Sequence, residues 1–135
     1  MAQSLRGSCL CRGVTFAIDG PLLAPLNCYC SMCRKAHSAA FRSRAGVRRA
    51  DLRVLSGEEL VRRYESSPGN WRCFCDRCGT RLWTEFADPN EPWGMPLALI
   101  NGDPGVRPRL HIMVAYKAPW HEITDDLPQF DELPT

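Results

Sequence analysis

The chain of 135 residues is long enough for one domain with a modest core and too short for two ordinary domains. Its hydrophobic content of 44% and charged content of 24% are typical of a soluble globular protein, and no apolar run approaches the ~18 residues of a membrane helix. The net charge of +2 is too small to favour nucleic acid as the main partner. We therefore expect a single domain over residues 1–135 with no membrane role.

The beginning of the chain, MAQSLRGSCLCRG, lacks the apolar segment of a secretory signal, so the expected compartment is the cytoplasm. The sequence contains eight cysteines. Because a reducing cytoplasm disfavours disulfides, these cysteines indicate metal binding.

Short strands dominate the predicted secondary structure. Apolar and β-branched runs predict strands at VTFAI (14–18), DLRVL (51–55), LALI (97–100) and HIMVAY (111–116). Helices are expected only over 31–37, where Ser31 is a suitable N-cap residue, and over 58–64. The fold class is therefore mostly β, with short sheets and one or two short helices.

The cysteines fall into three clusters, which are Cys9 and Cys11, then Cys28, Cys30 and Cys33, then Cys73, Cys75 and Cys78. The two C-x-x-C turns each direct two thiolates at one ion, and Gly79 allows the backbone to fold round the second turn. Thiolate ligands favour zinc, although an iron–sulfur cluster also takes four cysteines.

Eight thiols allow two arrangements. They form either two closed sites of four sulfurs, or one closed site and one site of three sulfurs with an exchangeable fourth ligand. The first arrangement is structural and the second is typical of catalytic zinc. The spacing alone does not decide which clusters share an ion.

Charge is distributed unevenly along the chain. Residues 1–81 carry 14 basic and 6 acidic side chains, giving +8, whereas residues 82–135 carry 3 and 9, giving −6. Of the 17 basic residues 15 are arginine, whose planar guanidinium suits carboxylate and phosphate. One interpretation is that the basic residues bind an anionic ligand near the cysteines. The other is that the opposite charges of the two halves of the chain face each other in the fold and cancel.

The order of the motifs resembles a known family. GSCLCRGVTFAI, CYCSMCRKAHSAAF, FCDRCGTRLW and HIMVAYKAPWHEITDDLPQF together resemble the glutathione-dependent formaldehyde-activating enzymes and centromere protein V, over nearly the whole chain. The resemblance implies a β-tent, a zinc-pinned fold of short antiparallel sheets shared with methionine sulfoxide reductase B.

The resemblance also implies ligand sets and an activity. It assigns Cys9, Cys11, Cys75 and Cys78 to a structural zinc and Cys28, Cys30 and Cys33 to a catalytic zinc, two ions per chain. The implied activity is that of a carbon–sulfur lyase joining glutathione, or a related thiol, to formaldehyde or another aldehyde. Arg34 and Arg42 are candidates for holding the carboxylates of the thiol.

Two departures from the family pattern affect the site. Tyr29 stands where the family often has histidine, and His37 follows later without an assigned role. Cys73 is an additional cysteine that should face the same side as Cys75 in an extended segment. We expect a free thiol near the metal, but Cys73 is also a possible fourth ligand of the three-cysteine site. A closed site would make the protein a non-catalytic zinc-stabilised interaction module.

The remaining candidate residues have ordinary structural interpretations. His111 and His121 are expected in core or surface positions, because the thiols suffice for two metal sites. The acidic segment DDLPQFDELP (125–134) is expected to be a solvated loop.

Overall fold

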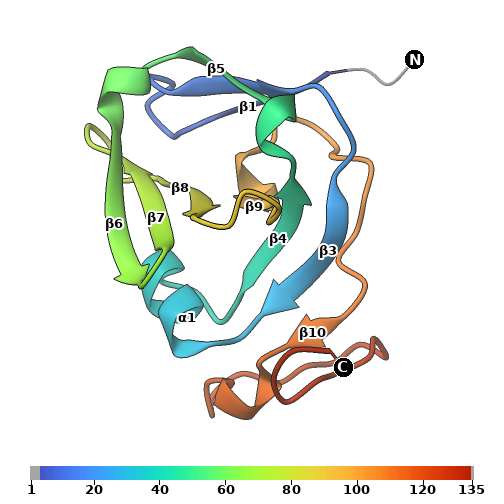
Figure 1. The fold of residues 1–135 in the computed structure, drawn as a ribbon. Coiled ribbons are helices and arrows are strands. Elements are labelled where there is room, and N and C mark those ends of the chain that lie inside the picture. The colour runs from blue at the N-terminus through green and yellow to red at the C-terminus, as the bar shows by residue number, and fades with distance from the viewer. Residues whose placement is uncertain (1–3, 135) are drawn as a thin grey trace.

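The computed structural model describes residues 4–134. Its strands are β1 (Leu5–Ser8), β2 (Thr15–Ile18), β3 (Leu23–Cys28), β4 (Arg42–Val47), β5 (Leu52–Ser56), β6 (Val61–Ser67), β7 (Asn70–Cys75), β8 (Arg81–Phe86), β9 (Trp93–Pro96) and β10 (His111–Ile112). One α-helix, α1 (Ser31–His37), and the 3₁₀ turns Arg49–Asp51, Glu58–Leu60, Leu97–Leu99 and Val114–Tyr116 complete the described elements (Figure 1).

The strands form two sheets. The smaller sheet has the order β1-β2-β5, and the larger has the order β10-β3-β4-β9-β8-β7-β6. All pairings are antiparallel except that of β10 with β3. In Figure 1 the larger sheet curves round from β6 to β3, and the smaller sheet lies across its upper end.

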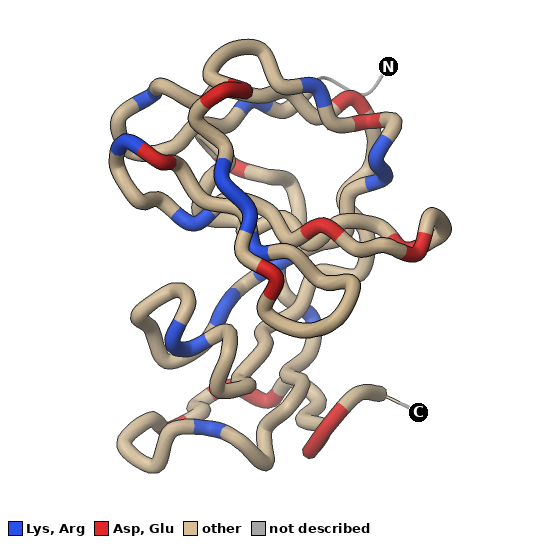
Figure 2. The backbone as a smooth tube through the Cα atoms, turned by 60° about the vertical axis from the view of Figure 1, so that its left-hand side comes forward, with Lys and Arg blue, Asp and Glu red and all other residues tan. Residues whose placement is uncertain are grey.

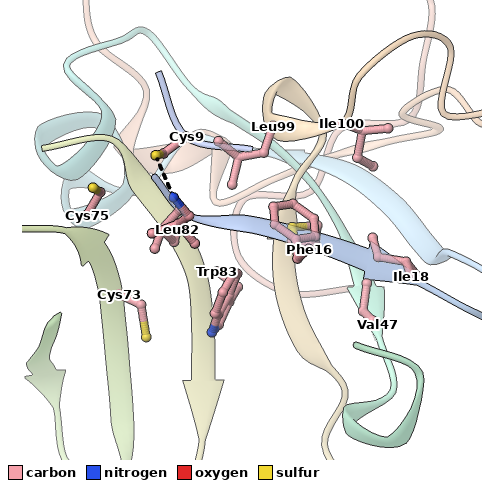
Figure 3. Close-up of a cluster of buried hydrophobic side chains, with 12 residues drawn as sticks. Cys9, Phe16, Ile18, Val47, Cys73, Cys75, Leu82, Trp83, Leu99 and Ile100 are labelled. Carbon is pink, nitrogen blue, oxygen red and sulfur yellow. Dashed lines mark hydrogen bonds between the residues drawn. The ribbon is translucent and has the colours of Figure 1, made fainter. Parts of the chain in front are cut away.

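The main core lies between the two sheets. Phe16 of β2 meets Trp83 of β8 edge to face, with ring centroids 5.6 Å apart, and Val47 and Ile18 pack beside them (Figure 3). Cys9 and Cys75 belong to the same buried cluster, so one cysteine group borders the core directly. A second, smaller cluster contains Cys28, Cys33 and Ile112.

The second cluster lies at the opposite end of the larger sheet. There β3 ends at Cys28 and α1 begins three residues later, while β10 and the C-terminal segment run beside the same end of β3 (Figure 1). The two cysteine clusters are therefore attached to different parts of the fold.

Several sequence predictions are confirmed. The chain is mostly β, with one short α-helix, and the strands predicted over 14–18 and 51–55 are β2 and β5. The helix predicted over 31–37 is α1.

Three element predictions were wrong, in part or entirely. The run 58–64 is a 3₁₀ turn followed by β6, because β6 pairs along its length with β7, and this pairing overrides local helix propensity. In the run 97–100, Leu97–Leu99 form a 3₁₀ turn after Pro96 and only Ile100 makes an isolated bridge, with Gly7. A short apolar run does not distinguish a strand from a buried turn. The run 111–116 is a strand only at His111–Ile112, because Met113 adopts a left-handed conformation.

Acidic and basic positions are interleaved over the upper part of the fold, and acidic positions recur in the segment that ends at the C-terminus (Figure 2). Within residues 4–134, none of the helices has the length and apolar content needed to cross a bilayer.

Candidate metal centres

The first cysteine group joins two distant segments. The sulfurs of Cys9, Cys11, Cys75 and Cys78 all lie within 4.8 Å of one another. Cys9 and Cys11 come from the loop between β1 and β2, whereas Cys75 ends β7 and Cys78 lies in the turn before β8. Backbone bonds from Cys9 N to Val14 O (3.1 Å) and from Gly79 N to Cys75 O (2.8 Å) close the two turns.

This group fits a tetrahedral ion. Zinc–sulfur bonds of about 2.3 Å place the sulfurs of a tetrahedral site about 3.8 Å apart. The Sγ atoms of Cys9 and Cys11 are 3.5 Å apart, and those of Cys11 and Cys75 are 3.9 Å apart. The donor set and its spacing therefore suit a metal ion with four thiolate ligands.

Local donors favour thiolates in this group. The hydroxyl and backbone of Thr80 lower the pKa of Cys78 to about 5. The Arg77 guanidinium, whose Nε lies 3.3 Å from the Cys11 sulfur, lowers the pKa of Cys11. Burial acts in the opposite direction on Cys75 and raises its pKa to about 11.

The second group consists of Cys28, Cys30 and Cys33, called the triad below. Their sulfurs also lie within 4.8 Å of one another. Cys28 ends β3, and its backbone position is fixed on one side by Arg42 of β4 and on the other by Ile112 of β10. Cys33 is the buried residue of α1.

The helix start brings two triad sulfurs together. Cys30, and not Ser31 as the sequence suggested, is the N-cap residue, and its Sγ accepts a hydrogen bond of 3.3 Å from Cys33 N. A sulfur takes the capping role because Cys30 has the extended backbone that a cap requires, whereas Ser31 is already helical. The Cys30 sulfur thus caps the helix and is also one of the three sulfurs of the triad.

Positive charge surrounds the triad. The sulfurs of Cys28 and Cys30 lower the pKa of Cys33, and Arg72 and Arg42 lower it further. The same sulfur contacts raise the pKa of Cys28. Arg72 Nη2 of β7 lies 3.6 Å from the Cys33 sulfur. The sequence did not single out Arg72, because only the curvature of the sheet brings β7 next to α1.

The two arginines that the sequence suggested for substrate lie close to the triad in different settings. Arg42 is only 5% exposed, and its Nη2 donates to Gly94 O (2.8 Å). Arg34 follows Cys33 directly on α1. The Nε atoms of both arginines are buried without a hydrogen-bond partner among the described residues.

A basic groove opens beside the triad. This hollow of about 320 Å³ lies between α1 and strands β6, β7 and β8, and it is lined by Met32, Lys35, Ala36, Tyr64, Ser66, Arg72 and Arg81. Arg72 Nε donates to Ser66 Oγ (3.2 Å), and its Nη1 is buried without a partner among residues 4–134. Arg81 Nε donates to Ala36 O (2.8 Å) and so holds the end of α1 against β8. Three cations therefore meet in one hollow next to Cys33.

Comparison with known proteins identifies the family of this chain. Residues 4–116 match the family described as "Glutathione-dependent formaldehyde-activating enzyme". The chain belongs to this family. The resemblance to the glutathione-dependent formaldehyde-activating enzymes and the expectation of an enzyme are both confirmed.

Individual relatives agree with the family match. A putative glutathione-dependent formaldehyde-activating enzyme of Halomonas elongata is 37% identical over 129 residues, which cover 88% of this chain and 80% of that protein. An uncharacterized lyase of Schizosaccharomyces pombe is 30% identical over 98 residues, covering 71% of this chain and 68% of that protein. A Rhodobacter sphaeroides crystal structure has a TM-score of 0.61 and 28% identity, covering 77% of this chain and 92% of that one.

Cys73, the cysteine outside the family pattern, belongs to neither sulfur group. It is buried like Cys75, as strand alternation predicts, but its sulfur points away from those of Cys9 and Cys75 (Figure 3). Cys73 Sγ donates to Glu85 Oε2 (3.4 Å), which also accepts from Trp83 Nε1 (3.0 Å). Burial raises the pKa of Cys73, so the thiol stays protonated as a donor to this carboxylate.

His37, at the end of α1, is half-buried near several cations. Burial lowers its pKa to about 4, and Arg42 contributes in the same direction. His37 is therefore neutral at physiological pH.

The two sulfur groups predict independent metal loss. Cys33→Ser should remove one metal ion per chain and leave the other, and Cys75→Ser should do the reverse, because no described cysteine belongs to both groups. Cys73→Ser should leave the metal content unchanged. Elemental analysis of the purified variants measures these numbers, and loss of metal in Cys73→Ser would contradict the assignment.

His37 predicts a pH dependence of stability. Its folded pKa of about 4 lies below the ordinary value of 6.5, so the unfolded state binds the proton more readily. Protonation therefore costs stability as pH falls from 6.5 to about 4, and His37→Gln should reduce this loss while changing little above pH 7. Urea unfolding of both proteins across this range measures the difference. Parallel curves would rule out the histidine as the cause.

Proposed function

We propose that this protein is a zinc enzyme that forms or breaks the carbon–sulfur bond between glutathione, or a related thiol, and formaldehyde or another aldehyde. Membership of the formaldehyde-activating family supports the substrates. The observation that carries the proposal is the difference between the two sulfur groups, one with four sulfurs and one with three.

The four-sulfur group, Cys9, Cys11, Cys75 and Cys78, is proposed to hold a structural zinc. The triad, Cys28, Cys30 and Cys33, is proposed to hold a catalytic zinc. Among the described residues, no fourth cysteine, histidine or carboxylate atom joins the triad, which supports a fourth position open to substrate. The hydrogen bond of Cys73 to Glu85 supports its exclusion from that position. We therefore favour the enzyme over a closed interaction module.

Cys28, Cys30 and Cys33 would hold the zinc ion, which would supply a position at which the thiol of glutathione could lose its proton at neutral pH. In the forward direction the sulfur bonds to the aldehyde carbon, the carbon–oxygen π electrons move to oxygen, and that oxygen takes up a proton. No electrons are gained or lost overall. The product of glutathione and formaldehyde is S-(hydroxymethyl)glutathione.

The surrounding arginines stabilise negative charge. Three thiolates and a divalent ion carry a net negative charge, which a fourth thiolate increases. Arg72 lies within 3.6 Å of the Cys33 sulfur, and Arg42 is held beneath the triad by its bond to Gly94 O. Arg42 remains a candidate for contact with substrate. Because its burial restricts access, we also assign it a role in compensating the negative charge of the triad.

The basic groove is proposed to bind the carboxylates of the thiol. Its described lining includes three cations, Lys35, Arg72 and Arg81, and no carboxylate. Arg34 does not line this groove, but it is retained as a further candidate because it follows Cys33 on the same helix. Holding the tripeptide here would place its thiol toward the triad, so positioning accounts for much of the proposed catalysis.

A cytoplasmic location forms part of the proposal. Free thiolates and reduced glutathione coexist in a reducing compartment, where the eight cysteines remain available as ligands.

The direct test counts sulfur neighbours of zinc. X-ray absorption of the two-zinc protein should give an average of about 3.5 sulfurs per ion, rising towards four with glutathione. Nuclear magnetic resonance exchange spectroscopy should then show faster interconversion of formaldehyde and its glutathione adduct than in buffer. Two ions already at four sulfurs and unchanged by glutathione would establish the closed interaction module instead.

The groove predicts selectivity among thiols. Lys35→Gln and Arg72→Gln should each weaken glutathione binding, by roughly 3- to 30-fold, because a charge-assisted contact to a carboxylate is lost. Binding of 2-mercaptoethanol, which has no carboxylate, should change little in Lys35→Gln. Arg48→Gln, an exposed position outside the groove, is the matched control. Calorimetric titration measures the affinities, and equal binding of glutathione by all variants would exclude the groove.

A further inference from the structure

The C-terminal segment is hydrogen-bonded to the strand beside the triad. His111 of β10 forms a parallel bridge with Gln129, and His111 N donates to Pro128 O (2.9 Å). Phe130 N donates back to His111 O (2.9 Å). The segment expected from its composition to be a solvated loop therefore extends the edge of the larger sheet.

On its other edge, β10 pairs with the end of β3 that carries Cys28 of the triad. β10 lies parallel to the end of β3, with His111 opposite Asn27 and Ile112 opposite Cys28. Tyr29 N, between two triad cysteines, donates to Ile112 O (3.1 Å). Two residues of β10 thus connect the C-terminal segment to the triad.

A chain of side-chain hydrogen bonds follows the same route. His111 Nε2 lies 2.8 and 3.1 Å from the two carboxylate oxygens of Asp125. His111 Nδ1 lies 3.0 Å from Tyr29 Oη. We call Asp125, His111 and Tyr29 the histidine bridge.

Chemistry fixes the direction of these bonds. The Asp125 carboxylate only accepts, so His111 Nε2 carries the proton and donates it. In the neutral ring Nδ1 then accepts, and the Tyr29 hydroxyl donates to it. Asn27 Nδ2 approaches the same Nδ1 at 3.5 Å, while Asn27 Oδ1 accepts from Ser43 Oγ (2.6 Å). Every polar atom of this buried histidine ring has a partner.

Burial leaves the side chains of the histidine bridge few alternative positions. Tyr29 and His111 are each 1% exposed, whereas the Asp125 side chain is about half exposed. The Tyr29 ring also contacts Phe41 and His121, with centroids 5.0 and 5.8 Å apart. A buried hydroxyl without its acceptor is costly, so the tyrosine can take few other positions. Because Tyr29 lies between Cys28 and Cys30, its position restricts both sulfurs.

We propose that Asp125, acting through His111, holds Tyr29 and thereby positions Cys28 and Cys30 as ligands of the triad metal ion. This inference rests on the proposed function, since it concerns the metal at the triad. Asp125 belongs to the last motif of the family resemblance, HIMVAYKAPWHEITDDLPQF, and lies beyond residues 4–116, which match the family model. Its bond to His111 therefore extends the site into the C-terminal segment. The three members are positioning residues, because none is assigned a contact with substrate.

The test compares the two metal sites of one molecule. Tyr29→Phe removes the hydroxyl but keeps the stacked ring, and Asp125→Asn removes the carboxylate but can keep the turn bond from Leu127 N. Asp126→Asn is the matched control, because its side chain is exposed and makes no hydrogen bond in the described chain. Each protein is loaded with zinc and titrated with a chromophoric chelator, which measures zinc affinity. A second sample of each is loaded with cadmium-113, whose nuclear magnetic resonance signals report on the two sites separately.

We expect the affinity of the triad site for zinc to fall about 10-fold in Tyr29→Phe and in Asp125→Asn, within the range found for residues that orient metal ligands. The cadmium signal of the triad should shift in both variants, and that of the four-sulfur site should stay unchanged. The double variant should lose less than the product of the single effects, because both act through His111. Asp126→Asn should behave as the unmodified protein.

Three results would overturn the inference. If the variants leave the zinc affinity and cadmium signal of the triad unchanged, the three residues have no positioning role. If both metal sites are weakened equally, the variants affect only the overall stability of the fold. Binding of only one ion by the unmodified protein would reject the proposed function and the inference together. Two ions in the unmodified protein with unaffected variants would reject the inference alone.

Discussion

The approach of four cysteine sulfurs from two distant turns is the constraint on which the upper part of the fold depends. Cys11 and Cys75 are separated by 64 positions, yet their sulfurs lie 3.9 Å apart. Four thiolates at this distance would repel one another without a cation among them, so a metal ion bound here would couple its binding to folding. Cys9 and Cys75 also belong to the main core, so apolar packing holds two of the four sulfurs of this group in place.

The second sulfur group is built on different principles. Cys28, Cys30 and Cys33 are close in sequence, and a strand end followed directly by a helix start is sufficient to bring them together. What the distant parts of the chain contribute is the environment. β7 brings Arg72, β4 brings Arg42, and β10 brings the hydrogen bonds of His111. A local motif thus acquires its charge and rigidity from three other strands.

The neighbouring groups place the cysteines of this protein in contrasting environments. Cys78 has donors that favour its thiolate, and Cys33 has nearby cations and sulfurs that do the same. Cys73 instead meets the carboxylate of Glu85 in a buried setting, which favours the protonated thiol. Cys73 therefore differs from the cysteines of the two sulfur groups in donating its thiol proton to a carboxylate and in lying outside both groups.

The sequence by itself determined the three cysteine clusters, the helix over 31–37 and the mostly-β class, because ligand spacing, capping and strand periodicity are local properties. Which clusters lie together was implied only by the family resemblance, because Cys11 and Cys75 are far apart in the sequence. Only the tertiary structure decided that 61–67 is a strand, since its partner β7 overrides a helix-like local composition. It also decided where Arg72 and Asp125 lie. Each is brought to the triad by sheet curvature or strand pairing between segments far apart in the sequence, and local sequence patterns do not encode such contacts.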